Sequence, residues 1–187
     1  HSLKYQRYER TADDLLIPHE LLEQHLIFSD QKKGELMSTA MDPVKAKAWF
    51  GAPPPDLTMV ARARDSEWVY NYLKTFYVDE SRPFGVNNKV FENVGMPNVL
   101  MELQGIQRLN CESAVEDCRE LMVETGSGIY SQDEFDNAIC DLTNFLHYVG
   151  DPSQEQRRSL GVWVLVFLAF LGIFTYLLNR EYWKDVH

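Results

Sequence analysis

Residues 84–100, FGVNNKVFENVGMPNVL, place a methionine between a glycine and a proline, in a stretch whose composition excludes a helix. Asparagine, glycine and proline interrupt it throughout, at Asn87, Asn88, Asn93, Gly85, Gly95 and Pro97. Apolar side chains normally enter a core from helices and strands. The ordinary interpretation of Met96 is therefore a loop methionine that packs on the core.

A second interpretation is that Met96 is a metal ligand. A methionine thioether is a soft, weak ligand that favours reduced iron, and its pairing with histidine raises the potential of a haem. Such a ligand has to come from a loop that follows the contour of the cofactor. Gly95 would let the backbone approach closely, and Pro97 would stiffen the exit. The triplet by itself leaves both interpretations open.

Two features upstream favour the ligand interpretation. The segment APPPDL, residues 52–57, predicts a stiff, extended, apolar wall. Arg62 and Arg64 follow it, and their guanidinium groups are able to pair with buried carboxylates such as haem propionates. Ordinary surface ion pairs are the alternative for the two arginines.

The segment LGVWVLVFLAFLGIFTYLL, residues 160–178, carries no charge. As a helix it would span about 28 Å, which is close to the hydrocarbon thickness of a bilayer. Basic and aromatic residues flank it, as expected at the two interfaces, namely Arg157, Arg158, Arg180, Tyr182, Trp183 and Lys184. A buried core helix is the alternative, but such helices rarely run this long without a polar face. We predict a membrane-spanning helix whose orientation the flanking charges do not decide.

Helix signals recur in the rest of the chain. Asp42 and Pro43 at the start and Gly51 at the end predict a short helix between them. Apolar residues recur at helical spacing over 66–77 and again over 131–149, where Ser131 and Glu134 form a capping-box pattern. The residues between 77 and 131 have weak regular patterns, which predicts that something besides side-chain packing organises them.

Composition excludes some classes of protein. The net charge of −10 argues against a nucleic-acid binder and suits a basic partner. The histidines of HELLEQH, residues 19–25, are six apart rather than four, so a helical zinc-protease motif is absent from the sequence. Cys111 and Cys118 would form a disulfide only in an oxidising compartment, and their spacing does not decide whether they are bonded.

Four segments together resemble the cytochrome c1 family. They are HSLKYQRY at residues 1–8, APPPDLTMVARARDSEWVYNYL at 52–73, GVNNKVFENVGMPNVL at 85–100, and LLNREYWKDVH at 177–187. The resemblance implies an all-α fold with a c-type cytochrome domain over residues 1–152, whose N-terminal part would be missing. A transmembrane anchor with a short cytoplasmic tail would follow over 153–187. The first domain would lie in the periplasm, on the outer side of the inner membrane.

The resemblance also implies a set of haem-binding residues. In this family a C-x-x-C-H motif attaches haem c covalently, and its histidine is an axial iron ligand. His1 matches that histidine, so the two cysteines are expected upstream of it, and Met96 would be the second axial ligand. Arg64 would bind a haem propionate. The haem pocket would be lined by Pro55, Trp68 and Phe91.

The implied function is electron transfer in the respiratory cytochrome bc1 complex, ubiquinol–cytochrome c oxidoreductase. The haem would receive electrons from a Rieske iron–sulfur protein and pass them to a soluble, basic c-type cytochrome. Cytochrome b, the lipid bilayer and a dimeric complex would complete the assembly. The isolated chain would not be a catalyst. The alternative is a cofactor-free, single-pass interaction module whose long loop region is ordered by a partner protein.

Overall fold

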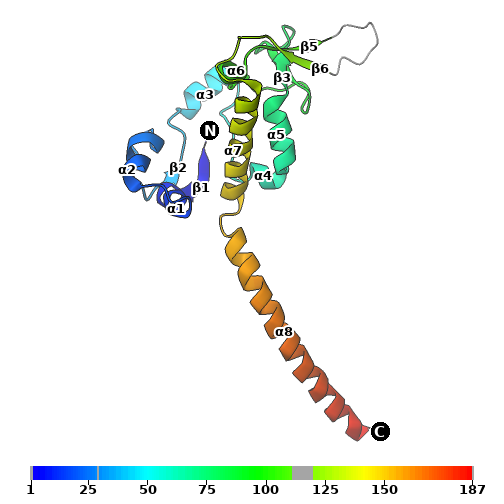
Figure 1. Cartoon of the computed structure of the whole chain (residues 1–187). Helices are drawn as coiled ribbons and strands as arrows, with labels where there is room; N and C mark the ends of the chain where they lie inside the picture. The colour runs from blue at the N-terminus through cyan, green and yellow to red at the C-terminus, as the bar shows by residue number, and fades with distance from the viewer. Residues whose placement is uncertain (1, 29, 111–119, 187) are drawn as a thin grey trace. The chain divides into compact units, whose positions relative to one another are not determined.

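The computed structural model describes residues 2–28, 30–110 and 120–186. The chain divides into two units, residues 1–150 and residues 151–187, and each is described by itself. In the first unit the elements are, in order, β1 (Leu3–Arg7), α1 (Tyr8–Asp14), α2 (His19–Leu21), η1 (Leu22–Leu26), β2 (Leu36–Met37), α3 (Pro43–Phe50), α4 (Val60–Ala63), α5 (Ser66–Lys74), β3 (Phe76–Val78), β4 (Val86–Asn88), α6 (Met101–Gln104), β5 (Gln107–Asn110), β6 (Glu120–Val123) and α7 (Gln132–Gly150) (Figure 1).

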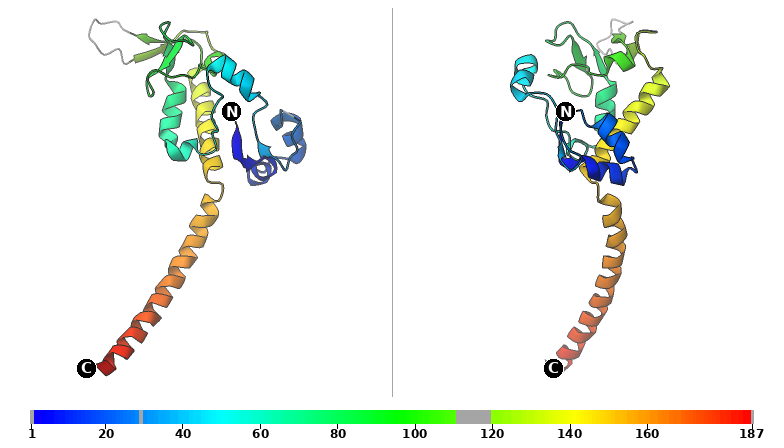
Figure 2. Two further views of the ribbon diagram at one scale, coloured as in Figure 1. Left: turned by 180° about the vertical axis from the view of Figure 1, so that it is seen from behind. Right: turned by 90° about the vertical axis from the view of Figure 1, so that its left-hand side faces the viewer.

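Helices carry most of the regular structure, which confirms the predicted all-α class. Three small antiparallel ribbons accompany them, formed by the strand pairs β1–β2, β3–β4 and β5–β6. Helices α5 and α7 run side by side (Figures 1 and 2). Strands β3 and β5 lie together near the C-terminal end of α5 (Figure 2).

The predicted caps of two helices are confirmed. Asp42 precedes α3 and accepts hydrogen bonds from the amides of Val44 and Lys45, and Gly51 ends the helix with a φ of 77°. At the start of α7, the Glu134 carboxylate accepts from the Ser131 amide at 2.9 Å and from its hydroxyl at 2.8 Å. The reciprocal bond from the Glu134 amide to the Ser131 hydroxyl completes the capping box.

The helix predicted over residues 66–77 is shorter in the structure. Helix α5 ends at Lys74, and Phe76 begins strand β3, where it pairs with Asn88. The carbonyl group of Lys74 accepts hydrogen bonds from the side-chain amides of Gln104 and Gln107, at 2.9 and 3.0 Å. These long-range donors satisfy the end of the helix, so the helix does not have to continue.

The core of the first unit contains three small apolar clusters, besides the buried Phe135, Ile139 and Val149 of α7. The N-terminal cluster consists of Tyr8, Ala12 and Leu22, with Ile17, Ile27 and Met37 packed against it. The central cluster consists of Ala61, Val69 and Leu146, with Leu3, Leu57, Val60, Trp68 and Leu73. The methionine cluster consists of Phe76, Val86 and Val94, with Tyr72, Phe84 and Met96. Met96, the proposed metal ligand, therefore lies at the edge of a core cluster.

Strand pairs organise the stretch between residues 77 and 131. Pairing of β3 with β4 and of β5 with β6 closes two hairpins. The backbone at Gly128 also passes very close to the backbone at Gln104. A Cβ added at Gly128 would lie 2.6 Å from the carbonyl carbon of Gln104. Only glycine fits at such an approach.

The second unit consists of helix α8 (Gln154–Tyr182) and the short helix η2 (Trp183–Val186). Helix α8 has 29 residues, and its most apolar stretch has a mean hydropathy of 2.4. None of its residues is buried within the chain. Its length and composition fit a membrane anchor. Within it, the Thr175 hydroxyl donates to the carbonyls of Leu171 and Gly172 of its own helix, both at 3.0 Å.

Candidate functional site

Met96 follows β4 in an irregular loop, and its side chain is half-buried. The Tyr72 hydroxyl of α5 lies 3.4 Å from the Met96 sulfur and donates a hydrogen bond to it. The sulfur is thus held from the α5 side. A thioether sulfur has two lone pairs, so one hydrogen bond leaves the second free to bind a metal.

Asn88 connects the Met96 loop to α5. It is fully buried, and its side-chain amide donates to the carbonyl of Tyr72 at 2.7 Å. Its side-chain oxygen accepts from the amides of Val90 and Phe91 at 2.9 and 3.1 Å, and from the Thr75 hydroxyl at 3.3 Å. One side chain therefore binds several backbone groups of α5 and of the loop.

Asn87 performs the same task one residue earlier. Its side-chain oxygen accepts from the amides of Asn88 and Asn93, at 2.9 and 3.0 Å, and its amide donates to Asp79 at 3.1 Å. Asn93 itself has a φ of 61°, a left-handed conformation that asparagine tolerates better than most residues. These bonds fix the loop three residues before Met96.

Three side chains stack along one side of α5. The Arg64 guanidinium lies 5.2 Å from the centroid of the Trp68 ring, and that ring stacks on Tyr72 at 5.0 Å with an interplanar angle of 9°. We call Arg64, Trp68 and Tyr72 the α5 column. The Tyr72 ring then meets Phe76 edge-on at 5.1 Å. Burial raises the pKa of the Tyr72 hydroxyl, so it is a protonated donor at neutral pH.

Ser2 and Lys4 are hydrogen-bonded to the end of the segment APPPDL, residues 52–57. The Ser2 carbonyl accepts from the Leu57 amide at 2.9 Å. The Asp56 carboxylate accepts from the Lys4 amide at 2.7 Å and from the Ser2 hydroxyl at 3.1 Å. Partial burial acts to raise the pKa of Asp56, but hydrogen bonds from Lys4, Thr58 and Ser2 outweigh it and hold this pKa below its usual value.

The structure brings together some of the predicted site residues. Arg64 and Trp68 belong to the α5 column, which leads to Met96 through Tyr72. Pro55 is exposed and precedes Asp56, whose carboxylate binds Ser2 and Lys4. Phe91 is 47% exposed, although its backbone amide donates to the Asn88 side chain. His1, Cys111 and Cys118 lie outside the described residues.

The residues around Met96 fit a haem. They offer a soft sulfur donor, two stacked aromatic rings of α5 and the guanidinium group of Arg64, which caps α4 just before α5 begins. A Cβ added at Gly95 would meet no atom of the described residues within 4 Å. Packing within the described chain therefore does not require a glycine there, whereas close approach of a bound cofactor would.

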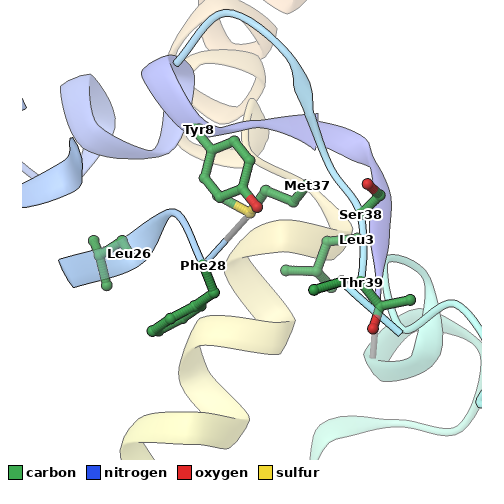
Figure 3. A pocket seen from close by; sticks show the side chains of 8 residues that line it. Leu3, Tyr8, Leu26, Phe28, Met37, Ser38 and Thr39 are labelled. Atoms are coloured by element: carbon green, nitrogen blue, oxygen red, sulfur yellow. The ribbon is translucent and has the colours of Figure 1, made fainter. Parts of the chain in front are cut away.

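A cavity of about 440 Å³ lies elsewhere, beside the N-terminal cluster. Figure 3 shows its lining, with Tyr8 and Met37 adjacent to each other and Leu26 and Phe28 contributed by the segment that follows α2. Met37, which lines this cavity, packs against the N-terminal cluster and is a core residue. None of the predicted site residues that the structure describes lines this cavity.

The sequence interpretation missed the roles of Tyr72, Asn87 and Asn88. Tyr72 was placed on the apolar face of its helix. The spacing of Arg64, Trp68 and Tyr72, four residues apart, is the signal that could have shown a continuous column. The asparagines were recognised as helix breakers, but their hydrogen-bond partners depend on the tertiary fold.

Comparison with known proteins supplies the family. A model of the Cytochrome C1 family matches residues 29–186. Cytochrome c1 of Allochromatium vinosum is 49% identical, over the whole of this chain and 78% of the relative. A protein of Nitrosomonas europaea named ammonia monooxygenase gamma subunit is 42% identical, over the whole of this chain and 77% of the relative. Cytochrome c1 of Rhodospirillum rubrum is 27% identical over 79% of this chain and 56% of the relative. The chain with the α5 column and the Met96 loop therefore belongs to the cytochrome c1 family.

Proposed function

We propose that this chain carries haem c in a cytochrome bc1 complex and transfers electrons from a Rieske iron–sulfur protein to a soluble, basic c-type cytochrome. Membership of the cytochrome c1 family makes the chain a haem electron-transfer subunit, and it decides against the cofactor-free interaction module. The apolar helix α8 fits a membrane anchor. The assembly, its partners and the periplasmic location of residues 1–152 belong to the proposal.

The observation that carries the proposal is the position of Met96. Its sulfur is half-buried, fixed by the Tyr72 hydroxyl and carried on a loop that Asn87 and Asn88 tie to the fold. When bound, the haem would supply an iron that gains and loses one electron. The protein's task is to hold the thioether in place, to limit access of water and to balance charge.

Three further roles complete the proposed site. Arg64 would bind a haem propionate, and its guanidinium is already oriented by Trp68. His1 would be the second axial ligand, with haem attached through cysteines upstream of it. The bonds of Ser2 to Asp56 and Leu57 support this role, because they fix the residue that follows His1 in the sequence. Trp68 and Phe91 would contact the ring system.

The charge of the chain suits the proposed acceptor. Acidic residues outnumber basic ones by 28 to 18, so a basic cytochrome would be attracted over long distances. This attraction mainly raises the encounter rate and weakens as salt is added. Cytochrome b, a dimeric complex and an inner-membrane location are carried over from the family resemblance.

One relative suggests a second candidate function. The Nitrosomonas europaea protein is named as a subunit of ammonia monooxygenase, and it is 42% identical to this chain. The same haem subunit would then serve a monooxygenase. Purification of the intact complex from solubilised membranes distinguishes the two. Copurifying b-type haem and an iron–sulfur protein support the bc1 assembly, whereas copurifying monooxygenase subunits support the second candidate.

The test of the ligand assignment is Met96→Leu in the full membrane complex. We expect the haem to remain attached, the far-red charge-transfer band of thioether-ligated ferric haem to disappear, and the midpoint potential to fall. Met37→Leu is the matched control, because Met37 is a partly buried core methionine. An unchanged potential and band in Met96→Leu would remove Met96 from the iron.

A further inference from the structure

We infer that Tyr72 is a positioning residue for Met96: its hydroxyl aims the thioether and raises the potential of the haem. The inference rests on the proposed function, since it requires Met96 as an iron ligand. The observation behind it is the 3.4 Å hydrogen bond from the Tyr72 hydroxyl to the Met96 sulfur. Sulfur is a large acceptor, so its hydrogen bonds are longer than those to oxygen.

The ring of Tyr72 has little freedom to turn the hydroxyl elsewhere. One face stacks on Trp68 at 5.0 Å, nearly parallel, and Phe76 meets the ring edge-on at 5.1 Å. Such aromatic contacts fix ring orientation as well as burying area. The Arg64 guanidinium closes the other end of the column over Trp68. The hydroxyl therefore points at the sulfur as a result of packing on several sides.

Donor and acceptor share one anchor. Asn88 donates to the backbone carbonyl of Tyr72 at 2.7 Å, and its side-chain oxygen accepts from the amides that open the Met96 loop. The same buried side chain thus sets the position of the helix that carries the hydroxyl and of the loop that carries the sulfur. This arrangement keeps their separation constant without a covalent link.

The effect on potential follows from the direction of the O–H dipole. Its positive end faces the sulfur, so it withdraws electron density from the lone pairs and lowers the donor strength of the thioether. A weaker donor stabilises ferric iron less than a stronger one does. The dipole also disfavours additional positive charge nearby. Both contributions favour the reduced haem and therefore raise its potential.

The experiment compares Tyr72→Phe with Tyr70→Phe in the full complex. Tyr72→Phe keeps the ring and its stacking and removes only the hydroxyl. Tyr70 lies on the same helix, and its hydroxyl accepts a hydrogen bond from Lys74 at 3.2 Å, so Tyr70→Phe is the same chemical change away from the sulfur. We expect a lower midpoint potential and a shifted, but retained, far-red band in Tyr72→Phe alone. Equal potentials and bands in the two variants would overturn the inference.

A double variant separates a direct action on the sulfur from a general effect on the haem pocket. In a Met96→Leu background the hydroxyl has no sulfur to act on and only its direct effect on nearby charge remains, so adding Tyr72→Phe should lower the potential by less than it does in the wild type. A further fall of equal size in this background would contradict the inference. Thermal unfolding of each variant checks that the fold is retained.

The outcomes distinguish this inference from the proposed function. If Met96→Leu by itself changes neither band nor potential, the ligand assignment fails. If Met96→Leu lowers the potential while Tyr72→Phe behaves like Tyr70→Phe, the ligand assignment stands and only the role of Tyr72 fails.

Discussion

The Met96 loop is irregular, whereas residues 2–4 lead into strand β1, and different chemical groups hold the two segments. The loop is held by neutral amides, those of Asn87 and Asn88. The N-terminal residues are held by a carboxylate, that of Asp56. The amides keep the same hydrogen-bonding capacity at any moderate pH, whereas the carboxylate loses acceptor capacity when it is protonated.

The two segments should therefore respond differently to acid and to mutation. The segment that carries the proposed thioether ligand should be less sensitive to acid, although Asn87 also donates to the Asp79 carboxylate, and sensitive to loss of a single buried side chain. The segment that follows the proposed histidine ligand should loosen in acid. Three substitutions test this contrast, in order of decreasing effect on stability.

The largest effect is expected from Asn88→Ala. It removes a fully buried side chain and leaves the Tyr72 carbonyl and the amides of Val90 and Phe91 without their partner. An unsatisfied buried polar group costs roughly 1–3 kcal/mol, and because water can reach part of these groups we expect a total loss of about 2–3 kcal/mol. Denaturant unfolding measures it, and the far-red band should weaken with it.

Asn98→Ala is the matched control for this change. Asn98 also lies in the loop region, but its side-chain oxygen accepts from one amide, that of Leu100, at 3.1 Å. We expect a loss of about 1 kcal/mol and an unchanged band. Equal losses for the two asparagines would contradict the special role given to Asn88.

A smaller effect is expected from Asp56→Asn, and it should depend on pH. The pKa of Asp56 in the folded protein lies below the ordinary carboxyl value of 3.8. The carboxylate therefore stabilises the fold fully above that ordinary value, and the contribution is lost as the pH falls through the lowered pKa. At neutral pH we expect Asp56→Asn to cost about 1 kcal/mol.

Unfolding free energies of the wild type and Asp56→Asn, followed from neutral pH into acid, test this sign. The two curves should converge on acidification. A difference that persists unchanged in strong acid would show that the ionised carboxylate contributes nothing specific.

The smallest effect on folding is expected from Gly95→Ala, since the added Cβ would meet no described atom within 4 Å. The free energy of unfolding without haem should change by less than about 1 kcal/mol. The far-red band should nevertheless weaken, because the methyl group would obstruct the approach of the cofactor to Met96. Gly128→Ala is the contrasting change, since its Cβ would lie 2.6 Å from the Gln104 carbonyl carbon and should destabilise the fold itself. An unchanged far-red band in Gly95→Ala would remove the reason given for this glycine.

The sequence predicted helix positions well where neighbouring residues determine where the helix begins and ends. The capping residues around α3 and α7 and the apolar length of α8 are of this kind. The end of α5 was wrong by three residues, because Phe76 continues the helical apolar spacing. What ends the helix is a pair of glutamine side chains about thirty residues away, and no local pattern contains them.

The candidate site was predictable to a similar extent. Met96 and Arg64 were identified from motif and resemblance, and their roles remain predictions. The Tyr72 hydroxyl was not identified, since a tyrosine at a core-facing helical position is ordinarily a packing residue. The short strands β3 and β4 were missed because three-residue runs have too little alternation to distinguish them from loop.

The Thr175 hydroxyl of α8 makes both of its hydrogen bonds within its own helix. It therefore places no demand on a neighbouring helix or on a lipid carbonyl at that depth. Contact between this segment and another helix would then rest on shape at this position, since a Cβ added at Gly172 would meet open space and small residues let helices approach closely.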